Sequence, residues 1–358
     1  MSKIFGILGL QDSDRSFVNT IGQAVVYDAV AQVLDEHNES IRQIQNVFVD
    51  NEFEEFKFRY KLPGGGYLQK RSGQGPSGKG KAYGQWDVAF PLEDFGDGLG
   101  GDDVALAYMT MQELNTHLDT IMIADINTVR LEILKAMFDN VQYTFADRIH
   151  GDLTIEPLAN GDSVLYPPVI GSDSEATEDH YLASGYAAGS ISDTNNPIKT
   201  IVADIVHHFD NPTGGSNVIV FINSAQTAAV EGLTDFVEVE DINVRPGNDQ
   251  DTLVNLPSNV PGRIIGRTNG GWVSEWDYIP AGYMLGVHLD KPKPLGVRID
   301  PKATGLPSGL SLVATKQDAP LEYSDYRHRF GVAAKNRLNG VVMQLTTGSY
   351  SVPSGFSH

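Results

Sequence analysis

An apolar stripe of unusual length runs through residues 101–140 and constrains the fold more than any other feature of the sequence. Its members recur at steps of three and four residues, the spacing of one helix face. They are Val104, Ala107, Met111, Leu114, Leu118, Met122, Ile126, Val129, Ile133 and Met137. Asp102 and Asp103 occupy the expected N-cap and first turn, and Lys135 lies near the far end, where the helix dipole favours a cation. The pattern predicts one helix over 101–140, about 60 Å long at 1.5 Å per residue.

A helix of this length is typical of a coiled coil, a membrane span or a helix laid across a sheet. Charged residues along it, among them Glu113, Asp125 and Arg130, exclude the roughly 18 consecutive apolar residues that a bilayer span requires. Consecutive steps of four break a strict heptad, and no second stretch of comparable length is present to pair with it. The sequence therefore favours a spine helix packed along a sheet, or one paired with another subunit, and predicts no membrane partner.

Net charge and cysteine content exclude further classes of function. The chain has 358 residues, of which 41% are hydrophobic, enough for a proper core in about two domains. A formal net charge of -20 opposes binding to nucleic acid through its phosphates. Cysteine is absent, which excludes disulfides, thiolate metal sites and thiol catalysis and is typical of an intracellular or virion protein. The segment 1–10 lacks a small-residue cleavage site, so no signal peptide is expected.

Two segments before the long helix have contrasting patterns. Residues 16–37 carry apolar residues at helical spacing and predict a helix that ends at Asn38. Residues 53–61 and 82–90 predict the two arms of a long hairpin, with Pro63 and Pro91 after them. Between the arms lies a glycine-rich stretch with almost no apolar residues.

The hairpin tip contains four cations in an otherwise acidic protein, so an acidic surface on another copy of the chain is a natural partner. A solvated loop without a partner explains the composition equally well. The residues that the sequence singles out for an inter-subunit contact are Tyr67, Leu68, Lys70, Arg71, Lys79 and Lys81.

No cofactor, metal or catalytic site is predicted. Residues 96–101 match the pattern GxGxxG, but the following helix exceeds a βαβ unit and nearby aspartates oppose a pyrophosphate, so a glycine hinge is favoured. The acidic loop 172–180 lacks the spacing of an EF-hand and predicts a solvated loop. His207 and His208 are adjacent on a predicted helix, so they are expected to point about 100° apart, unsuited to one metal. We find no Ser, His and carboxylate set with the spacing of a known catalytic motif.

The second half of the chain predicts a mixture of helices and strands, an α+β arrangement. The expected elements are a helix from Asn196-Pro197 to Phe209, a strand at Val218–Ile222, a helix capped by Ser224 through Leu233, a three-strand meander at 263–268, 272–276 and 283–290, and a closing hairpin of 326–336 and 341–347 with its turn at Asn339-Gly340.

Five stretches in this order carry a resemblance to a known family. They are the strand and helix Val218–Leu233, the turn Ile279-Pro280-Ala281-Gly282-Tyr283, the strand Gly296–Ile299, and the closing segments Tyr326–Val332 and Asn339–Val342. Together with the hairpin and the spine helix, this order resembles the major capsid proteins of tailed bacteriophages, the coat fold shared with encapsulins and the herpesvirus capsid floor. The resemblance covers about residues 47–347 and depends on the order of elements.

The resemblance implies a division into an N-terminal arm, an extended loop, a peripheral domain and an axial domain. These correspond to 1–46, 47–95, 96–150 with 316–340, and 151–315 with 341–358. It further implies a non-enzymatic protein that assembles as hexamers and pentamers into an icosahedral shell around double-stranded DNA, without sequence-specific binding. The expected partners are other copies of the chain, a separate scaffolding protein, a portal and a decoration protein. The expected location is the virion capsid, and the host cytoplasm before assembly.

Two alternatives stay open at this point. One is an encapsulin-type nanocompartment shell, and the other, from a different class, is an α+β hydrolase or sugar-binding enzyme. Particle mass separates the shells from an enzyme, and enclosed nucleic acid separates a phage coat from an encapsulin.

Overall fold

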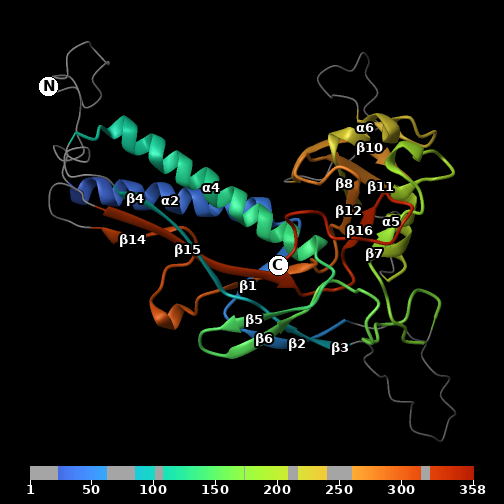
Figure 1. The fold of residues 1–358 in the computed structure, drawn as a ribbon, viewed down its shortest axis with the longest axis horizontal. Coiled ribbons are helices and arrows are strands. Elements are labelled where there is room, and N and C mark those ends of the chain that lie inside the picture. Colours follow the sequence, from blue (N-terminus) through green and yellow to red (C-terminus); the bar gives the residue numbers. More distant parts are fainter. Residues whose placement is uncertain are drawn as a thin grey trace, which may run out of the picture. The chain divides into compact units, whose positions relative to one another are not determined.

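The computed structural model describes residues 23–62, 85–100, 108–172, 174–208, 217–239, 260–315 and 323–358. The elements form an α+β protein (Figure 1). Its helices are α2 (Gln23–Gln45), α4 (Met111–Phe138), α5 (Pro197–Val206), α6 (Ser224–Glu231) and the short 3₁₀ turns η2 (Ala188–Ser190) and η4 (Lys302–Thr304). Its strands are β1 (Val49–Phe53), β2 (Lys57–Lys61), β3 (Gln85–Ala89), β4 (Glu93–Gly100), β5 (Tyr143–Asp147), β6 (Gly151–Ile155), β7 (Tyr181–Ala183), β8 (Val218–Ile222), β9 (Val237–Glu238), β10 (Arg263–Thr268), β11 (Gly271–Glu275), β12 (Tyr283–His288), β13 (Leu295–Ile299), β14 (Ser311–Thr315), β15 (Tyr323–Ala334) and β16 (Val341–Gln344).

The chain divides into two compact units. Unit 1 is formed from the described parts of Met1–Gln43, Leu92–Glu132 and Arg298–Gly331, and unit 2 from those of Ile44–Pro91, Ile133–Val297 and Val332–His358. These units are packing units, and the four domains expected from the sequence stay predictions.

The predicted spine helix is present as α4, but it starts later than the sequence predicts. Its first turn is fixed by a capping box, in which Thr110 Oγ1 accepts from the Glu113 backbone N–H (3.3 Å) and the Glu113 carboxylate accepts from the Thr110 N–H (2.8 Å). Tyr108 and Met109 lie before the helix, so a start at residue 101 is wrong, and the expected cap at Asp102 lies outside the described residues. With 28 residues, α4 is about 42 Å long.

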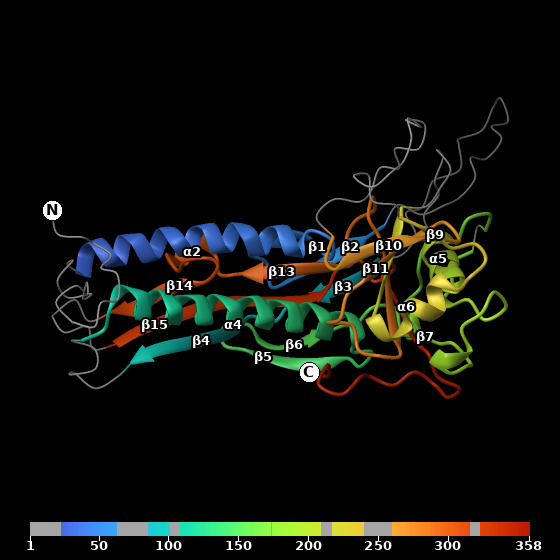
Figure 2. The ribbon, with the colours of Figure 1, turned by 90° about the horizontal axis from the view of Figure 1, so that it is seen from above.

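The apolar stripe of α4 faces a core in unit 1, as predicted. Figure 2 shows α2 and α4 running side by side along β14 and β15. The buried residues of this core are Val26, Val30, Leu34, Met109, Leu114, Leu118, Ile121, Leu310 and Tyr326. The predicted end of the first helix at Asn38 is wrong. The Asn38 side chain instead donates to Leu310 O (3.1 Å) and accepts from Leu310 N (2.9 Å), so it bonds outward while α2 continues.

The glycine-rich stretch before α4 is a strand, and the expected hinge is therefore wrong. In unit 1, β4 pairs antiparallel with β15 from Phe330↔Glu93 to Tyr323↔Gly100, and β14 pairs with β15 as well. A Cβ at Gly96 would lie 3.0 Å from Tyr326 O, so glycine allows the two strands to approach. Because residues 96–100 of the GxGxxG match are extended, this part of the motif forms no phosphate-binding turn.

Unit 2 is built on a seven-stranded sheet with the order β7-β16-β12-β8-β11-β10-β9. All five residues of β8 are buried, because β8 lies between β11, which is parallel to it, and β12, which is antiparallel. The predicted meander is therefore wrong in one connection: β10 and β11 form a hairpin, but β8 separates β11 from β12. Sequence order suggests that each strand pairs with the next strand in the chain. A strand as apolar as β8, however, requires a partner strand on each side.

The predicted closing hairpin does not form. β16 pairs with β12 and β7, both of which lie in the seven-stranded sheet. The expected turn at Asn339-Gly340 is a buried linker, in which the Asn339 amide bonds to the backbone of His288 and to Pro292 O. Arg337 is also fully buried, with Nη2 2.8 Å from Asp162 Oδ2 and Nε donating to Pro157 O.

The helices after β7 match the predictions closely. α5 begins at the predicted Asn196-Pro197, with Asn196 Oδ1 accepting from Lys199 N (3.1 Å), but it ends at Val206 and not at Phe209. α6 is capped by Asn223, whose side chain accepts from Ala225 N. The predicted cap at Ser224 is therefore wrong by one residue, because Ser224 is the first helical residue, and the helix ends at Glu231 and not at Leu233.

Candidate functional site

The two predicted hairpin arms are present as β2 and β3, which pair antiparallel from Lys57↔Ala89 to Lys61↔Gln85. Across the pair, Arg59 Nε donates to Asp87 Oδ1 at 2.8 Å on an exposed surface. The base is anchored in unit 2, because Trp86 is buried and its Nε1 donates to Lys335 O (3.0 Å). The hairpin thus has a fixed base.

The predicted inter-subunit contact belongs to the tip that follows this base. Tyr67, Leu68, Lys70, Arg71, Lys79 and Lys81 all lie outside the described residues. The structure therefore describes the two arms as far as Leu62 and from Gln85 onward, and the contact itself stays a prediction.

A buried carboxylate between two histidines joins three elements of unit 1. Asp125 on α4 is 2.7 Å from His328 Nδ1 on β15 through Oδ1, and 3.0 Å from His37 Nε2 on α2 through Oδ2. Burial would raise the pKa of the Asp125 carboxyl, but the hydrogen bonds from His328 and His37 outweigh it and hold the pKa below its usual value. The sequence does not predict this contact between Asp125 and the two histidines, because Asp125 stands there only as one of several charges along the helix.

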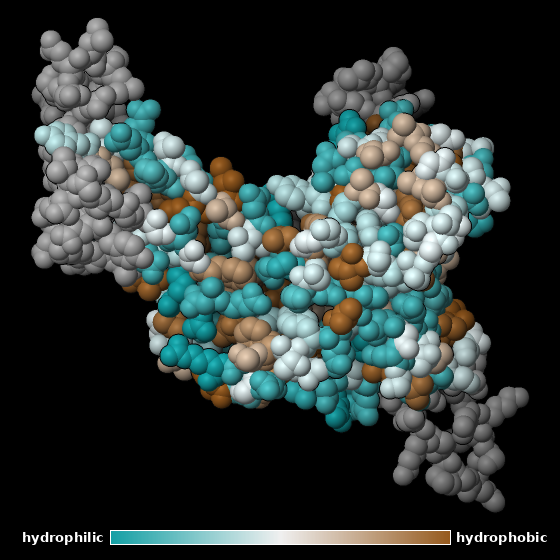
Figure 3. Space-filling view, viewed as in Figure 1, coloured by the Kyte–Doolittle hydropathy of each residue, from teal (hydrophilic) through white to brown (hydrophobic). Residues whose placement is uncertain are grey.

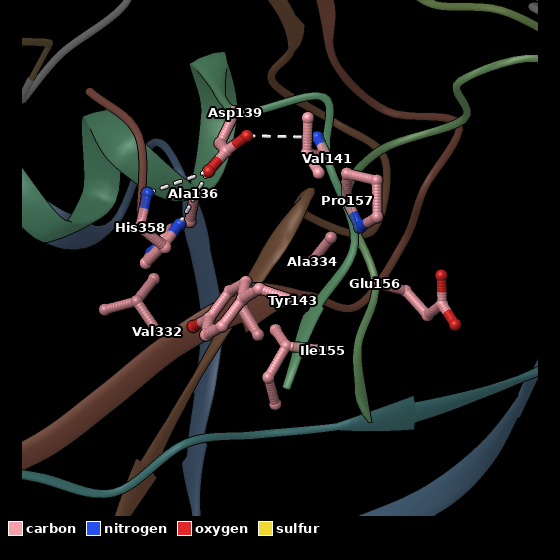
Figure 4. A pocket seen from close by; sticks show the side chains of 11 residues that line it. Ala136, Asp139, Val141, Tyr143, Ile155, Glu156, Pro157, Val332, Ala334 and His358 are labelled. Carbon is pink, nitrogen blue, oxygen red and sulfur yellow. Dashed lines mark hydrogen bonds and ion pairs between the residues drawn. The ribbon is translucent and has the colours of Figure 1, made fainter. Parts of the chain in front are cut away.

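In unit 2, His358 lies against a small pocket near the end of α4 (Figure 4). Asp139 Oδ2 accepts from the His358 backbone N–H (2.9 Å) and lies 3.2 Å from Nδ1, and the Tyr143 ring stacks on the imidazole with centroids 4.3 Å apart. Burial opposes ionisation of Asp139, yet the bonds from His358 and Val141 lower its pKa. The contact fixes residue 358 to the start of β5, a structural role.

A second group of titratable residues surrounds the end of α5. His207 Nε2 and His208 Nε2 are 2.9 Å apart, and Glu178 Oε2 lies 3.8 Å from the first and 3.9 Å from the second. The prediction that these imidazoles point apart is wrong. Because α5 ends at Val206, the angular spacing of helical residues does not apply to His208. The acidic loop is exposed or half-buried over residues 174–179, as expected for a solvated loop, and His180 at its end is fully inaccessible.

Burial and like charges shift the pKa values of this group. Burial lowers the pKa of His180 to about 3 and also lowers that of His208. Asp204, on α5, has its pKa raised to about 7, first by burial and then by Glu178 and Asp179. Neutral imidazoles and closely spaced carboxylates therefore lie together at the end of α5.

The surface is hydrophilic over most of the face in Figure 3, where apolar residues occur as small brown groups among teal ones. Several of the exposed apolar side chains belong to the two long helices, among them Val25 and Val33 on α2 and Ile123 on α4. Among the helices that the structure describes, none combines the length and apolar character of a bilayer-spanning helix.

Comparison with known proteins identifies the fold. No protein-family model and no curated protein matches the chain. A solved structure titled "Mycobacterium phage Patience" is similar with a TM-score of 0.66 at 21% identity, over 98% of this chain and 98% of that chain. "Capsid of native GTA particle computed with C5 symmetry" gives a TM-score of 0.46 at 14% identity, over 85% of this chain and 90% of that chain. "The capsid of Myoviridae Phage XM1" gives 0.44 at 10%, over 84% and 90%. The phage coat fold predicted from the sequence is thereby confirmed as the fold.

Proposed function

We propose that this chain is the major capsid protein of a tailed bacteriophage, which assembles as hexamers and pentamers into an icosahedral shell around double-stranded DNA. The observation that carries the proposal is the shared fold with the phage structure over 98% of both chains. A hairpin with a fixed base, a long spine helix and a net charge of -20 suit a plate that overlaps its neighbours and encloses DNA without adhering to it.

The hairpin tip is the proposed contact between subunits. Ordering a glycine-rich segment costs about 1 to 2 kcal/mol of backbone entropy per residue, which a partner must offset. In our proposal Lys70, Arg71, Lys79 and Lys81 meet carboxylates of the adjacent subunit, and Tyr67 and Leu68 supply the apolar contact. Further proposed partners are a separate scaffolding protein, a portal and a decoration protein. The proposed location is the virion capsid, reached from the host cytoplasm.

Particle size tests the shell function directly. Purified protein should elute at megadalton mass and show closed particles by electron microscopy, whereas a hydrolase or sugar-binding enzyme should elute as a small oligomer. Absorbance at 260 and 280 nm then separates the two shells, because a phage coat from infected cells encloses DNA and an encapsulin encloses protein cargo. A small oligomer under all assembly conditions would refute the proposal.

The role of the tip has its own test. Excising residues 64–81 and joining the arms with Asn-Gly should leave the unfolding transition nearly unchanged, because this glycine-rich stretch carries almost no apolar side chains for a core. Assembly, measured by light scattering, should fail. A charge variant changes Lys70, Arg71, Lys79 and Lys81 to Glu, and its matched control changes Gln69, Ser72, Gln74 and Ser77 to Ala. Closed particles of normal size from the excised protein would exclude the tip as the tie between subunits.

A further inference from the structure

Three potential metal ligands converge in unit 2 where α5 ends. His207 and His208 follow the last helical residue, and Glu178 reaches them from the loop before β7. The triangle formed by the two Nε2 atoms and Glu178 Oε2 has sides of 2.9, 3.8 and 3.9 Å. Three atoms with these separations share a point about 2.1 Å from each, within the range of about 2.0–2.2 Å for Zn–N and Zn–O bonds.

We propose that His207, His208 and Glu178 form a binding site for a divalent transition-metal ion of the Zn²⁺ type. Two imidazoles and one carboxylate are a typical donor set for such ions. Mg²⁺ and Ca²⁺ bind mainly oxygen ligands and suit this set less well. A small displacement of the ion from the plane of the three atoms leaves a fourth, tetrahedral position for water. This site is independent of the shell function proposed above.

The local charges favour a cation. Burial lowers the pKa of both histidines, which keeps them in the neutral form that ligates metals. Without a metal, one imidazole must carry its proton on Nε2 and donate a hydrogen bond to the Nε2 of the other across 2.9 Å. With a metal, both rings would carry the proton on Nδ1 and leave Nε2 free to ligate the ion. Glu178 and Asp204 have raised pKa values, caused first by burial, so a nearby cation would relieve the cost of keeping these carboxylates charged.

Two further side chains lie against the three proposed ligands. Asp204 Oδ1 lies 3.7 Å from His207 Nδ1, in a position to orient that ring when it carries the Nδ1 proton. His180 is fully buried, its ring centroid 5.5 Å from that of His208. Its Nδ1 bonds to Gly340 O (2.9 Å), and its Nε2 has no hydrogen-bond partner among the described residues. An unsatisfied buried nitrogen beside the trio is a polar group that a bound water or ion could satisfy.

The ion also has a route of entry. The side chain of His207 is 32% exposed and that of Glu178 is 17% exposed, whereas that of His208 is 1% exposed. Solvent thus reaches the half-buried side chains of His207 and Glu178, while the side chain of His208 is inaccessible. A bound ion would tie the end of α5 to the loop bearing Glu178, so binding should raise the stability of unit 2.

The test uses the full chain, stripped with EDTA and dialysed, with Zn²⁺ and Co²⁺ as probes. We expect one equivalent of Zn²⁺ per chain by calorimetry and elemental analysis, a visible Co²⁺ spectrum typical of four-coordination, and a higher melting temperature with Zn²⁺. His207→Gln and Glu178→Gln should each weaken binding by at least about tenfold and abolish the melting shift. The matched control is His117→Gln, an exposed histidine on α4, which should bind as the wild type does.

Two results would overturn the site. One is wild-type protein that takes up less than one equivalent of either ion and shows no Co²⁺ spectrum, a readout that needs no variant. The other is unchanged binding in His207→Gln and Glu178→Gln, which would place any bound metal elsewhere. Neither result bears on particle formation, so the shell proposal stands or falls separately.

Discussion

The two units of this chain differ in what their cores bury. Unit 2 buries a sheet whose central strand, β8, is apolar at all five positions and inaccessible throughout. Unit 1 buries the facing sides of α2 and α4 and places the Asp125 carboxylate among them, held by His37 and His328. The core around β8 is held by shape and apolar area, and the core between α2 and α4 also depends on a charge that must keep its hydrogen bonds.

This difference follows from how each element meets its neighbours. A central strand exposes no side chain to water on either face, so any charge there would lack a partner. A helix against a sheet has gaps at its flanks, where polar side chains from three elements can meet. The core between α2 and α4 should therefore respond to pH and to single polar changes, whereas the core around β8 should respond mainly to changes of volume.

The largest effect is expected from Leu118→Asp in unit 1. Leu118 is 5% exposed in the core between α2 and α4, so the new carboxylate would be buried without a partner and cost about 3 kcal/mol or more. Ile123→Asp, at a 59% exposed position on the same helix, should change stability by less than about 0.5 kcal/mol.

Hydrogen exchange by mass spectrometry locates this effect. In Leu118→Asp, peptides of α2 and α4 should lose protection while those of β8 and β12 keep it. Equal loss in both sets would mean that the units unfold together, which would break the comparison. Normal protection and normal particle yield would show that Leu118 does not face a core.

A smaller effect is expected from Gly286→Ala in unit 2. A Cβ at this position of β12 would lie 2.2 Å from Ile201 Cγ2 and 2.9 Å from Ile205 Cδ1 on α5. Overpacking of this kind costs about 1–3 kcal/mol in the free energy of unfolding, measured by denaturant titration. Gly189→Ala is the matched control, because a Cβ there has no neighbour within 4 Å.

The double variant Gly286→Ala/Ile201→Ala sharpens the volume argument. Removing the Ile201 side-chain branches makes room for the new methyl group, so the two costs should be clearly less than additive. Additive costs would mean that α5 does not press on β12 at this point.

Local patterns of the sequence were enough to predict most individual elements. The stripe of α4, the buried run of β8 and the Asn-Pro start of α5 each fix an element through contacts within a few residues. Partners of strands were predicted poorly, because β8 and β16 pair with strands distant in sequence. The Thr110–Glu113 capping box marks the start of α4 in the sequence, but Asp102 and Asp103 offer a similar N-cap signal nearer the glycines.

The polar sites were less predictable than the fold. Asp125, His37 and His328 come from three separate segments, and no spacing in the sequence links them. His207 and His208 were visible as a pair, but their geometry depends on where α5 ends, which an error of a few residues changes. The buried Arg337 and Asn339 sit beside a glycine in what reads as a turn, and only the tertiary structure shows them bonding inward.

The smallest effect, and the sharpest test of the polar core in unit 1, is expected from Asp125→Asn. The substitution keeps the shape of the side chain and removes its charge, so at neutral pH it should cost about 1 kcal/mol of stability through weakened hydrogen bonds. Asp119→Asn, an exposed site on the same helix, is the control and should behave as the wild type.

The stability of the wild type and that of Asp125→Asn should depend differently on pH. Because the folded-state pKa of Asp125 lies below the unfolded value of 3.8, the unfolded chain binds this proton more tightly. The stabilisation is therefore present above that value and is lost as the pH falls through the folded-state pKa. Denaturant midpoints measured from about pH 7 down to about pH 3 should decline in the wild type and in Asp119→Asn, with a shallower decline in Asp125→Asn. An equal decline in all three proteins would mean that His37 and His328 do not hold the carboxylate in its charged form. The core between α2 and α4 would then not depend on this charge, and its contrast with the core around β8 would be lost.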